Sequence, residues 1–281
     1  MEIVRTPHEM QQRAMTLRRH GRSIGFVPTM GFLHEGHLSL MRIAREKCDV
    51  LVVSIFVNPT QFGPNEDLDA YPRDFERDEQ LCRSESVDIV FYPEAGNMYL
   101  ADSSVWVDES SLSNVLCGES RPGHFRGVCT VVAKLFNIVQ PDLAVFGEKD
   151  AQQLRIIERM VRDLNFPIQI IRGPIVREPD GLAMSSRNKY LSDPQRIDAL
   201  CLQQALGLAK ELVSRGERNV MIIRQAMCDL IERVPGTSID YVEFVDDERL
   251  SSVDRLERAT LVALAVKIGA IRLIDNAILE V

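Results

Sequence analysis

Two histidines three residues apart are the side chains of this sequence best placed to do chemistry. His34 and His37 lie in the segment 28–37 (PTMGFLHEGH), between a short apolar run and an amphipathic one. This pattern predicts a strand, a tight glycine-containing turn, and then a helix. Side chains three apart at a helix start share one face, where unpaired backbone N–H groups also point. Such a turn is suited to polyphosphate, because both groups donate to phosphoryl oxygens and Gly36 leaves room for close approach.

A zinc site and a pair of helix caps are two other interpretations of this segment. Zinc-binding helices place their two histidines four residues apart, whereas these are three apart and no third ligand follows closely. Zinc is therefore disfavoured. A pair of solvent-facing helix caps stays open on this segment alone.

A second loop, 58–63, follows the strongest apolar run of the chain, 50–57. Its proline and glycine predict a chain reversal, and Asn58 and Gln61 offer neutral amides at the end of the predicted strand. Taken alone, this loop is more typical of an ordinary turn with exposed amides.

A third loop, 147–150, follows the apolar run 142–146. Lys149 offers a point charge for phosphate, while Asp150 can cap the next helix or accept from ribose hydroxyls. Gln153, one helical turn later, is expected to face the same cleft. A surface charge cluster with a helix cap explains this loop equally well.

A fourth loop, 177–188, begins near a Pro-Asp-Gly turn and continues into two hydroxyls and a guanidinium, from Ser185, Ser186 and Arg187. Such a loop can close over a triphosphate and stabilise oxygens that carry developing charge. Taken alone, it is more typical of a flexible linker between domains.

The elements expected around these loops form a parallel sheet. Up to about residue 172, predicted helices alternate with short apolar runs at 24–27, 50–57, 88–92, 142–146 and 168–171. Buried strands between helices predict a Rossmann-like, doubly wound α/β fold, in which ligands bind beyond the carboxyl ends of the strands. Such a sheet gathers all four loops at one edge, and this favours the ligand-binding interpretation of each.

A smaller C-terminal α+β domain is expected after about residue 175. Two helices and then three consecutive strands are predicted, at 193–215, 219–234, 239–245, 260–266 and 270–274. Hairpin-like connections indicate that these strands are antiparallel. We therefore expect a nucleotide-binding catalytic domain at 1–175 and a domain at 176–281 that closes over the active site.

Composition narrows the classes of function. The 281 residues carry 33 Lys and Arg against 41 Asp and Glu, so the formal net charge is −8. An acidic surface argues against nucleic-acid and anionic-membrane partners. Neither a Walker loop nor a G-x-G-x-x-G motif is present. A nucleotide therefore needs another phosphate site, which the turn of His34 and His37 can supply.

The cysteines and the N-terminus point to a cytoplasmic protein. Six scattered cysteines without a C-x-x-C pair exclude the usual zinc-finger spacings and a dense disulfide framework. They are typical of reduced thiols in the cytoplasm. The first residues lack the apolar stretch of a signal peptide, and no window reaches the roughly 18 apolar residues of a membrane span.

The four segments together resemble a known family. Residues 29–37 resemble the His-x-Gly-His signature of the nucleotidylyltransferase superfamily, and residues 184–187 (MSSR) resemble its second, Lys-Met-Ser-Lys-Ser-type loop. The full set of PTMG…HEGH, FVNPTQF, GEKD and MSSRN is similar to the pantothenate synthetase (pantoate–β-alanine ligase) family. The similarity runs in order from about residue 25 to residue 191.

The resemblance implies an ATP-dependent ligase with two half-reactions. Pantoate attacks the α-phosphate of ATP to give pantoyl adenylate and pyrophosphate, and the amine of β-alanine then displaces AMP to give pantothenate. By the same resemblance, four residues are catalytic, with His37 as the proton donor: His37, His34, Lys149 and Arg187. Pantoate would be held by Gln61 and Gln153, with Gln61 also contacting β-alanine and Asn58 beside it. The implied ATP-binding residues are Met30, Gly31, Phe32, Leu33, His34, Glu35, Gly36, His37, Gly147, Glu148, Lys149, Asp150, Val176, Met184, Ser185, Ser186 and Arg187.

Mg2+ is expected to accompany ATP, held mostly by phosphate and water. Among the acidic positions that the family places on the metal side, Asp78 matches, whereas Arg77 stands where some members carry another Asp. The resemblance also implies a homodimer.

Other functions on the same fold make different demands on the residues. A nucleotidylyltransferase with a phosphate-bearing acceptor calls for extra basic residues rather than Gln61 and Gln153. Neutral amides suit pantoate, because a fixed cation would pair with its carboxylate and weaken the nucleophile. A catalytically silent nucleotide-binding paralogue predicts erosion of the motifs, yet His34, His37 and Lys149 are all present. The short second domain and the acidic charge disfavour an aminoacyl-tRNA synthetase fragment.

Overall fold

A six-stranded parallel sheet forms the N-terminal part of the computed structural model, which describes residues 1–63, 66 and 68–281. The strands follow the order β1-β4-β3-β2-β5-β6, and every neighbouring pair is parallel. Their bounds are β1 Glu2–Val4, β2 Ile24–Thr29, β3 Val50–Ile55, β4 Ile89–Phe91, β5 Leu143–Gly147 and β6 Gln169–Gly173. The associated helices are α1 Pro7–Arg19, α2 Glu35–Arg45, α3 Phe75–Ser84, α4 Ala95–Met98, α5 Cys117–Ser120, α6 His124–Val139 and α7 Ala151–Asp163.

Helices cover both faces of this sheet because its central strands are apolar on both sides. All six residues of β3 are buried. On one face, Ile24 and Phe26 of β2 pack in a cluster with residues of α1, α6 and α7. On the other face, Val27 and Leu51 join the apolar side of α2. This alternation is what a doubly wound sheet requires.

The direction of winding changes beside β2. The sheet grows from β2 through β3 to β4 on one side, and the chain then crosses to place β5 and β6 on the other side. The carboxyl ends of β2 and β5 therefore flank the point where consecutive connections diverge. In open α/β sheets, ligands bind at such a point.

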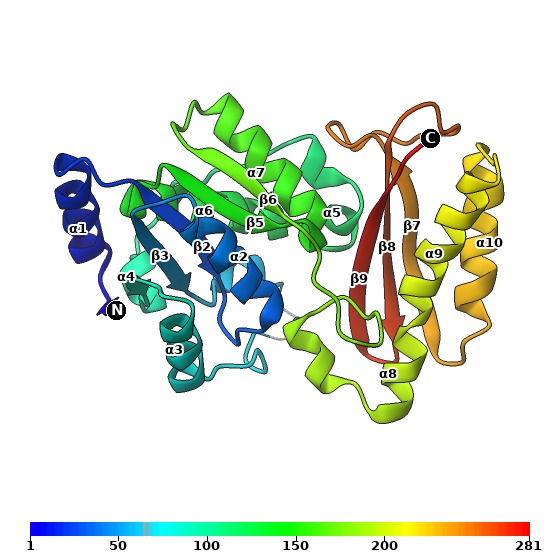
Figure 1. The fold of residues 1–281 in the computed structure, drawn as a ribbon, viewed down its shortest axis with the longest axis horizontal. Helices are drawn as coiled ribbons and strands as arrows, with labels where there is room; N and C mark the ends of the chain where they lie inside the picture. Colours follow the sequence, from blue (N-terminus) through cyan, green and yellow to red (C-terminus); the bar gives the residue numbers. More distant parts are fainter. Residues whose placement is uncertain (64–65, 67) are drawn as a thin grey trace.

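A three-stranded antiparallel sheet forms the C-terminal part, in the order β7-β8-β9. Its strands are β7 Thr237–Val245, β8 Thr260–Ile268 and β9 Ile271–Leu279, preceded by α8 Asp193–Ala199, α9 Cys201–Ser214 and α10 Val220–Glu232. Figure 1 shows α9 and α10 packed on the outer side of this sheet, while β9 faces the parallel sheet. Residues of α9 and α10 share one apolar cluster with all three strands.

The predicted fold class is confirmed, with a few differences in its elements. The sequence pattern did not indicate β1 and α1, and the helix expected at 193–215 is divided into α8 and α9. Strand β9 runs five residues beyond the end expected at residue 274. Within the described residues, no helix combines the length and apolar character that crossing a membrane requires.

Candidate active site

A tight turn joins β2 to α2, and two residues in it have left-handed backbone conformations. Gly31 has a φ of 82° and Phe32 a φ of 50°. The Gly31 N–H donates to the Thr29 hydroxyl at 3.1 Å. A β-carbon at position 31 would lie 3.0 Å from Asp78 Oδ2, so glycine meets both the conformational and the spatial requirement here.

Asp78, from α3, holds this turn in place. Its Oδ2 accepts from the Phe32 N–H and its Oδ1 from the Leu33 N–H, both at 2.7 Å. The side chain is only 2% exposed. Burial raises the pKa of Asp78, while the two backbone N–H groups act in the opposite direction. Both carboxylate oxygens are thus committed to the backbone of the turn.

The structure gives no support to a magnesium site at Asp78. A metal ligand needs an oxygen lone pair that faces the ion, and this buried carboxylate faces two N–H donors. Among the described residues, no group of three or more His, Cys, Asp or Glu side chains could hold a metal ion. Asp78 therefore fits the role of a support for the turn and does not fit that of a ligand.

His34 and His37 lie against each other at the start of α2, with ring centroids 4.1 Å apart. The His34 backbone N–H donates to His37 Nδ1 at 3.3 Å. In a neutral imidazole whose Nδ1 accepts, the proton sits on Nε2, so His37 offers an Nε2–H donor. His34 Nδ1 is buried and has no hydrogen-bond partner among the described residues. A buried polar atom without a partner calls for an explanation, and a ligand bound beside His37 would supply one.

Both imidazoles are neutral at physiological pH. Burial, reinforced by the charge of Lys149, lowers the pKa of His34 from 6.5 to about 4. Burial, with smaller effects of His34 and Lys149, also lowers the pKa of His37 well below 6.5. Neutral rings donate hydrogen bonds to phosphate without adding fixed charge.

Gln61 is held with its amide nitrogen available to a ligand. Its Oε1 accepts from Asn58 Nδ2 at 3.0 Å, and the same Asn58 nitrogen donates to the Gly127 carbonyl at 3.1 Å. Asn58 is only 1% exposed, so it orients Gln61 from behind. A β-carbon at Gly127 would collide with the Thr60 carbonyl, so the first turn of α6 lies against this loop only because residue 127 is glycine.

A second network fixes the backbone of Gln61. The Gln61 carbonyl accepts from His124 Nδ1 at 2.8 Å and from Arg121 at 3.3 Å. Since a carbonyl only accepts, His124 carries its proton on Nδ1, and its Nε2 accepts from Arg121 at 3.0 Å. Arg121 is paired in turn with both oxygens of Glu66, at 2.6 and 2.7 Å. Burial and the charge of Arg121 lower the pKa of His124 to about 4.

The neutral state of His124 makes the stability of the protein depend on pH. The unfolded chain protonates this histidine near its ordinary value of 6.5, whereas the folded protein does so near 4. Its stabilising contribution is therefore complete above pH 6.5 and is lost as the pH falls toward 4. We expect His124 to account for a decrease of about 1 kcal/mol in the free energy of unfolding between pH 7.5 and 5.5.

Urea unfolding at the two pH values checks this expectation. The His124→Gln variant should show a smaller decrease than the wild type, and the exposed His20→Gln variant should match the wild type. Equal decreases in the wild type and His124→Gln would show that folding does not lower the pKa of His124.

The turn after β5 brings a cation to the same sheet edge. The 3-10 turn η3, Glu148–Asp150, links β5 to α7. Lys149 Nζ lies 3.8 Å from Asp150 Oδ1, and the Lys149 side chain is 21% exposed. Gln153, one turn into α7, lines the same cavity.

The loop before α8 approaches from the C-terminal part. Ser186 Oγ donates to the Phe32 carbonyl at 3.3 Å, which ties this loop to the turn after β2. Ser185 Oγ accepts from the Arg187 N–H at 3.3 Å, so its hydroxyl proton can still be donated. The Met184 N–H donates to the Val176 carbonyl at 3.0 Å, which folds the loop back on its own start.

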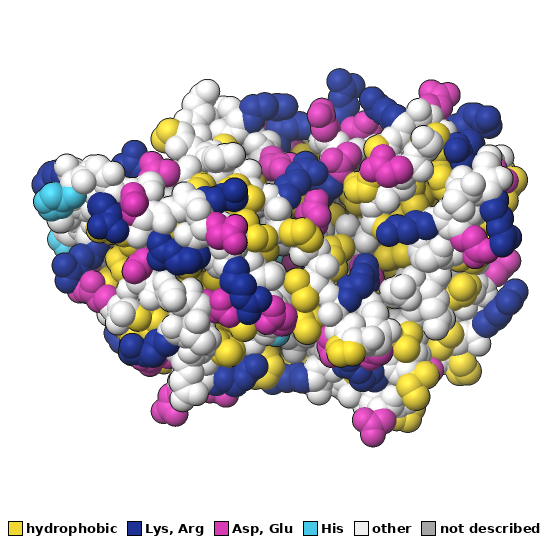
Figure 2. Space-filling model, viewed as in Figure 1, with side chains coloured by type: hydrophobic (Ala, Val, Ile, Leu, Met, Phe, Trp, Pro, Cys, Tyr) yellow, Lys and Arg dark blue, Asp and Glu magenta, His cyan; other side chains and the backbone are white. Residues whose placement is uncertain are grey.

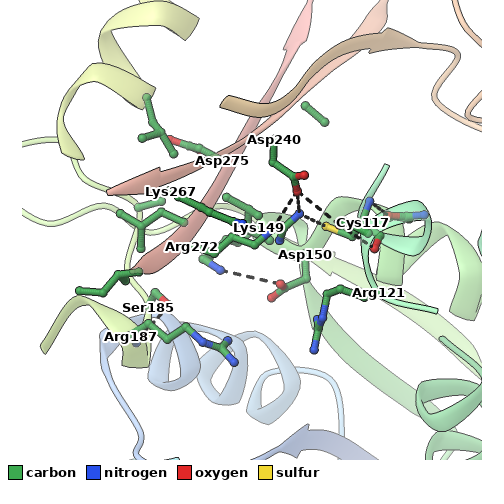
Figure 3. A pocket seen from close by; sticks show the side chains of 18 of the residues that line it. Cys117, Arg121, Lys149, Asp150, Ser185, Arg187, Asp240, Lys267, Arg272 and Asp275 are labelled. Carbon is green, nitrogen blue, oxygen red and sulfur yellow. Dashed lines mark hydrogen bonds and ion pairs between the residues drawn. The ribbon is translucent and has the colours of Figure 1, made fainter. Parts of the chain in front are cut away.

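These segments enclose a cavity of about 250 Å³. It is lined by residues that include Met30, His34, Gly36, His37, Gln61, Gly147, Lys149, Asp150, Gln153, Val176, Met184, Ser185, Ser186 and Arg187. A larger cavity of about 760 Å³ adjoins it and shares Lys149, Ser185 and Arg187 with it. Figure 3 shows that Lys149, Arg121 and Arg187 line this second cavity together with Arg272 of β9.

Cations outnumber carboxylates in the lining of the smaller cavity. On the face shown in Figure 2, Lys and Arg side chains alternate with Asp and Glu. The 250 Å³ cavity is lined by three cations, Arg121, Lys149 and Arg187, and by one carboxylate, that of Asp150. The larger cavity adds Lys267 and Arg272, together with Glu66, Asp240 and Asp275. An acidic protein can bind anionic substrates when its cations are grouped in this way.

Seven of the residues expected in the site lie outside the 250 Å³ cavity within the described part of the chain. Leu33 is fully buried in the core, and Glu35 pairs with Arg42 on the surface. Asn58 acts through Gln61, and Asp78 acts through the turn after β2. Gly31, Phe32 and Glu148 also fall outside the cavity lining. Phe32 instead contributes its carbonyl to Ser186.

Arg121 and His124 are site residues that the sequence did not reveal. Both line the cavity, and both contact the backbone of Gln61. An apolar wall from α6 was also missed, consisting of Val128, Val131, Val132 and Leu135. The Pro122-Gly123 pair before a strongly apolar helix is a signal that places His124 in the first turn.

Comparisons with known proteins agree with this geometry. The family model described as Pantoate-beta-alanine ligase matches residues 2–278. Pantothenate synthetase from Thermotoga neapolitana is 57% identical over 279 residues, which cover 99% of this chain and 100% of that protein. Pantothenate synthetase from Caldicellulosiruptor saccharolyticus is 54% identical over 281 residues, which cover 100% of both.

Solved structures are similar over the same length. Pantothenate synthetase from Thermus thermophilus matches with a TM-score of 0.93 and 44% identity, covering 99% of each chain. A pantoate-beta-alanine ligase from Francisella tularensis, complexed with beta-gamma ATP and beta-alanine, matches with a TM-score of 0.80 and 34% identity. This match covers 99% of the present chain and 97% of the other. The chain described here therefore belongs to the pantoate-beta-alanine ligase family.

Proposed function

We propose that this protein condenses pantoate with β-alanine at the expense of ATP, releasing AMP and pyrophosphate, in the 250 Å³ cavity at the edge of the parallel sheet and the larger cavity beside it. Membership of the ligase family gives the overall reaction. The observation that carries the residue assignments is that one cavity brings together two histidines, two cations and two amides of the predicted set: His34, His37, Lys149, Arg187, Gln61 and Gln153. These groups match the needs of a polyphosphate on one side and a carboxylate on the other.

In the first half-reaction, a pantoate carboxylate oxygen attacks the α-phosphorus of ATP. A new P–O bond forms to pantoate, and the bond from the α-phosphorus to the bridging oxygen breaks to release pyrophosphate. His37 Nε2–H, Lys149 and Arg187 are assigned to the oxygens on which charge accumulates. Phosphoryl and nucleotidyl transfer depends on positioning and charge neutralisation, which these donors supply without a covalent intermediate.

The pantoate end of the site combines amides with an apolar wall. Gln61 presents its amide nitrogen while Asn58 holds its Oε1, and Gln153 of α7 lines the same cavity. Neutral donors orient the carboxylate and leave it nucleophilic, whereas a cation would pair with it. The branched carbon skeleton of pantoate is assigned to the wall formed by Val128, Val131, Val132 and Leu135.

In the second half-reaction, the uncharged amine of β-alanine attacks the carbonyl carbon of the adenylate. A C–N bond forms, the acyl C–O bond to the phosphate breaks, and AMP leaves with that oxygen. The amine also gives up a proton, which solvent or the departing phosphate can take. The Gln61 side chain is assigned to both acid substrates, because it lines the same cavity as the histidines and the apolar wall.

An isotope experiment tests this route directly. Pantoate labelled with 18O in its carboxylate should transfer one labelled oxygen to AMP, detected by mass spectrometry. A nucleotidylyltransferase with a phosphate-bearing acceptor, or a silent paralogue, gives no labelled AMP. Unlabelled AMP formed together with pantothenate would exclude the adenylate.

Mg2+ is proposed to enter with ATP as part of the substrate, without a ligand from Asp78. Asp78→Asn should therefore leave the Mg2+ concentration for half-maximal activity unchanged. It should lower the free energy of unfolding by about 1–3 kcal/mol, because one backbone N–H of the turn loses its acceptor. Urea unfolding and a Mg2+ titration of AMP formation check both parts. A large rise in the Mg2+ requirement at unchanged stability would show that Asp78 is a ligand of the metal ion.

Three broader expectations stay predictions. We propose that the segments 1–175 and 176–281 act as two domains, and that the second closes over the site when ATP binds. A cytoplasmic location and a homodimer are also retained. Light scattering at twice the chain mass of 31.8 kDa would support the homodimer, and a monomer mass at assay concentration would contradict it.

A further inference from the structure

Two neighbouring polar residues are buried in β9, the edge strand of the C-terminal sheet that lies nearest the parallel sheet (Figure 1). Asp275 is 3% exposed and Asn276 is 6% exposed. Burying a carboxylate and an amide in a small sheet is costly unless both are fully hydrogen-bonded. Their partners belong to the two segments that the proposed function assigns to phosphate.

Asn276 holds the turn that carries Lys149. Its Nδ2 donates to the Glu148 carbonyl at 2.9 Å and to the Lys149 carbonyl at 3.0 Å. Both protons of the Asn276 side-chain amide therefore bind consecutive carbonyls of η3. Glu148 and Lys149 precede Asn276 by 128 and 127 positions in the chain, so this contact joins distant segments. It fixes the backbone from which the flexible Lys149 side chain extends.

Asp275 holds the base of the loop that carries Ser185 and Arg187. Its two oxygens accept from both terminal nitrogens of Arg177, at 2.7 and 3.0 Å. Arg177 pairs with Ala183 in an antiparallel bridge and donates to the Gly181 carbonyl at 3.1 Å. A bidentate pair with a carboxylate only 2% exposed allows little variation in geometry.

The two residues are also joined to each other. The Asn276 backbone N–H donates to Asp275 Oδ1 at 2.8 Å, the same oxygen that accepts from Arg177. Strand β9 itself is fixed by its antiparallel pairing with β8 along its whole length. One rigid strand thus connects the turn of Lys149 with the start of the loop of Arg187. Figure 3 shows Asp275, Lys149 and Arg187 around the same cavity.

We infer that Asn276 and Asp275 are positioning residues of the ligase reaction, which set Lys149 and the Ser185–Arg187 segment at a fixed separation across the polyphosphate. This inference rests on the proposed function. Lysine has a long flexible side chain, so its placement depends on where its backbone is held. Transition-state stabilisation is sensitive to shifts of about 1 Å in such groups. The C-terminal sheet then takes part in catalysis through backbone placement, although neither residue needs to touch substrate.

The test compares variants of Asn276 in two backgrounds. Asn276→Ala removes both donors to η3, and we expect the rate of pantoate-dependent ATP–pyrophosphate exchange to fall about 10- to 100-fold. In a Lys149→Met background the positioned amine is absent, so Asn276→Ala should lower the exchange rate by less than about 3-fold. A merely structural role predicts equal losses in the two backgrounds, and that result would overturn the inference.

A matched control separates positioning from general loss of stability. Asn219 also lies in the C-terminal part, where it caps α10, and it lines neither cavity. Its side chain accepts from the Met221 N–H at 3.0 Å. Asn219→Ala should lower the thermal unfolding temperature yet leave exchange unchanged. Exchange rates for Asn276→Ala within about 2-fold of those for Asn219→Ala would contradict the inference. If Asn276→Ala does not fold, Asn276→Ser, which keeps one donor, should show an intermediate loss.

The wild type decides separately whether the proposed function holds. If wild-type protein shows no pantoate-dependent exchange, the proposed function fails before any variant is compared. If the wild type is active and Asn276→Ala retains full activity, the reaction stands and the positioning role is wrong.

Discussion

His37→Ala is expected to lower the rate of adenylate formation about 100-fold while the protein stays folded. The reason is the direction of its ring, in which Nδ1 accepts from the His34 backbone and Nε2–H is left to donate. Removing one donor that is aimed at developing charge typically costs this much. Pantoate-dependent ATP–pyrophosphate exchange measures the step directly, with circular dichroism to verify folding.

Two further variants sharpen this prediction. His37→Gln places an amide N–H at nearly the reach of Nε2–H, so it should retain more activity than His37→Ala. The exposed His8→Ala, on α1 and far along the chain from the site, should match the wild type. A folded His37→Ala protein with most of its activity would remove His37 from the mechanism.

Lys149→Met is expected to lower the same rate by about 100-fold or more. Methionine keeps the length of the side chain and removes the charge, so the loss reports on neutralisation of the polyphosphate. Lys149 also lowers the pKa of both His34 and His37. In the variant the two pKa values should rise, and activity on the acidic side should therefore begin to fall at a higher pH than in the wild type.

Steady-state rates as a function of ATP concentration and pH check this prediction. Lys47→Met, an exposed lysine after the end of α2, is the matched control and should leave both the rate and the pH profile unchanged. If Lys149→Met raises only the KM for ATP and keeps kcat, Lys149 binds the ground state and the transition state equally. That outcome would contradict its assignment to the transition state.

The central strands of the fold were predictable because burial on both faces gives each of them a continuous apolar run. Strands such as β3 are short apolar runs that are buried on both faces, and this pattern is typical of parallel sheets. By contrast, β1 has three residues, and α1 buries only Met10 and Ala14, so neither gives a clear apolar periodicity. Such elements are stabilised by tertiary contacts that the local sequence does not encode.

The lining of the cavity was predictable where a residue lies on a loop at the edge of the parallel sheet. His34, His37, Lys149 and Arg187 lie on loops that a parallel sheet gathers at one edge, and all four line the cavity. Nothing in the sequence distinguishes a polar side chain that faces ligand from one that faces the backbone of a distant segment. Asp78, Asn58 and Asn276 are of the second kind, and their partners lie in other segments of the fold.

Asn276 illustrates this limit most clearly. In the sequence it lies two residues beyond the strand expected at 270–274, and no motif connects it with the Gly-Glu-Lys-Asp turn. Only the packing of β9 against η3 brings its amide to the carbonyls of Glu148 and Lys149. Support of this kind is a property of the folded protein, and a structure is needed to find it.

ATP–pyrophosphate exchange with Mg2+ and pantoate, in the absence of β-alanine, decides whether this protein forms an acyl adenylate. We expect exchange that requires pantoate, because adenylate formation is reversible and precedes the attack of the amine. Other carboxylic acids of similar size but without the branched skeleton should support exchange poorly. Folded protein that binds ATP yet shows no pantoate-dependent exchange would contradict the proposed adenylation chemistry.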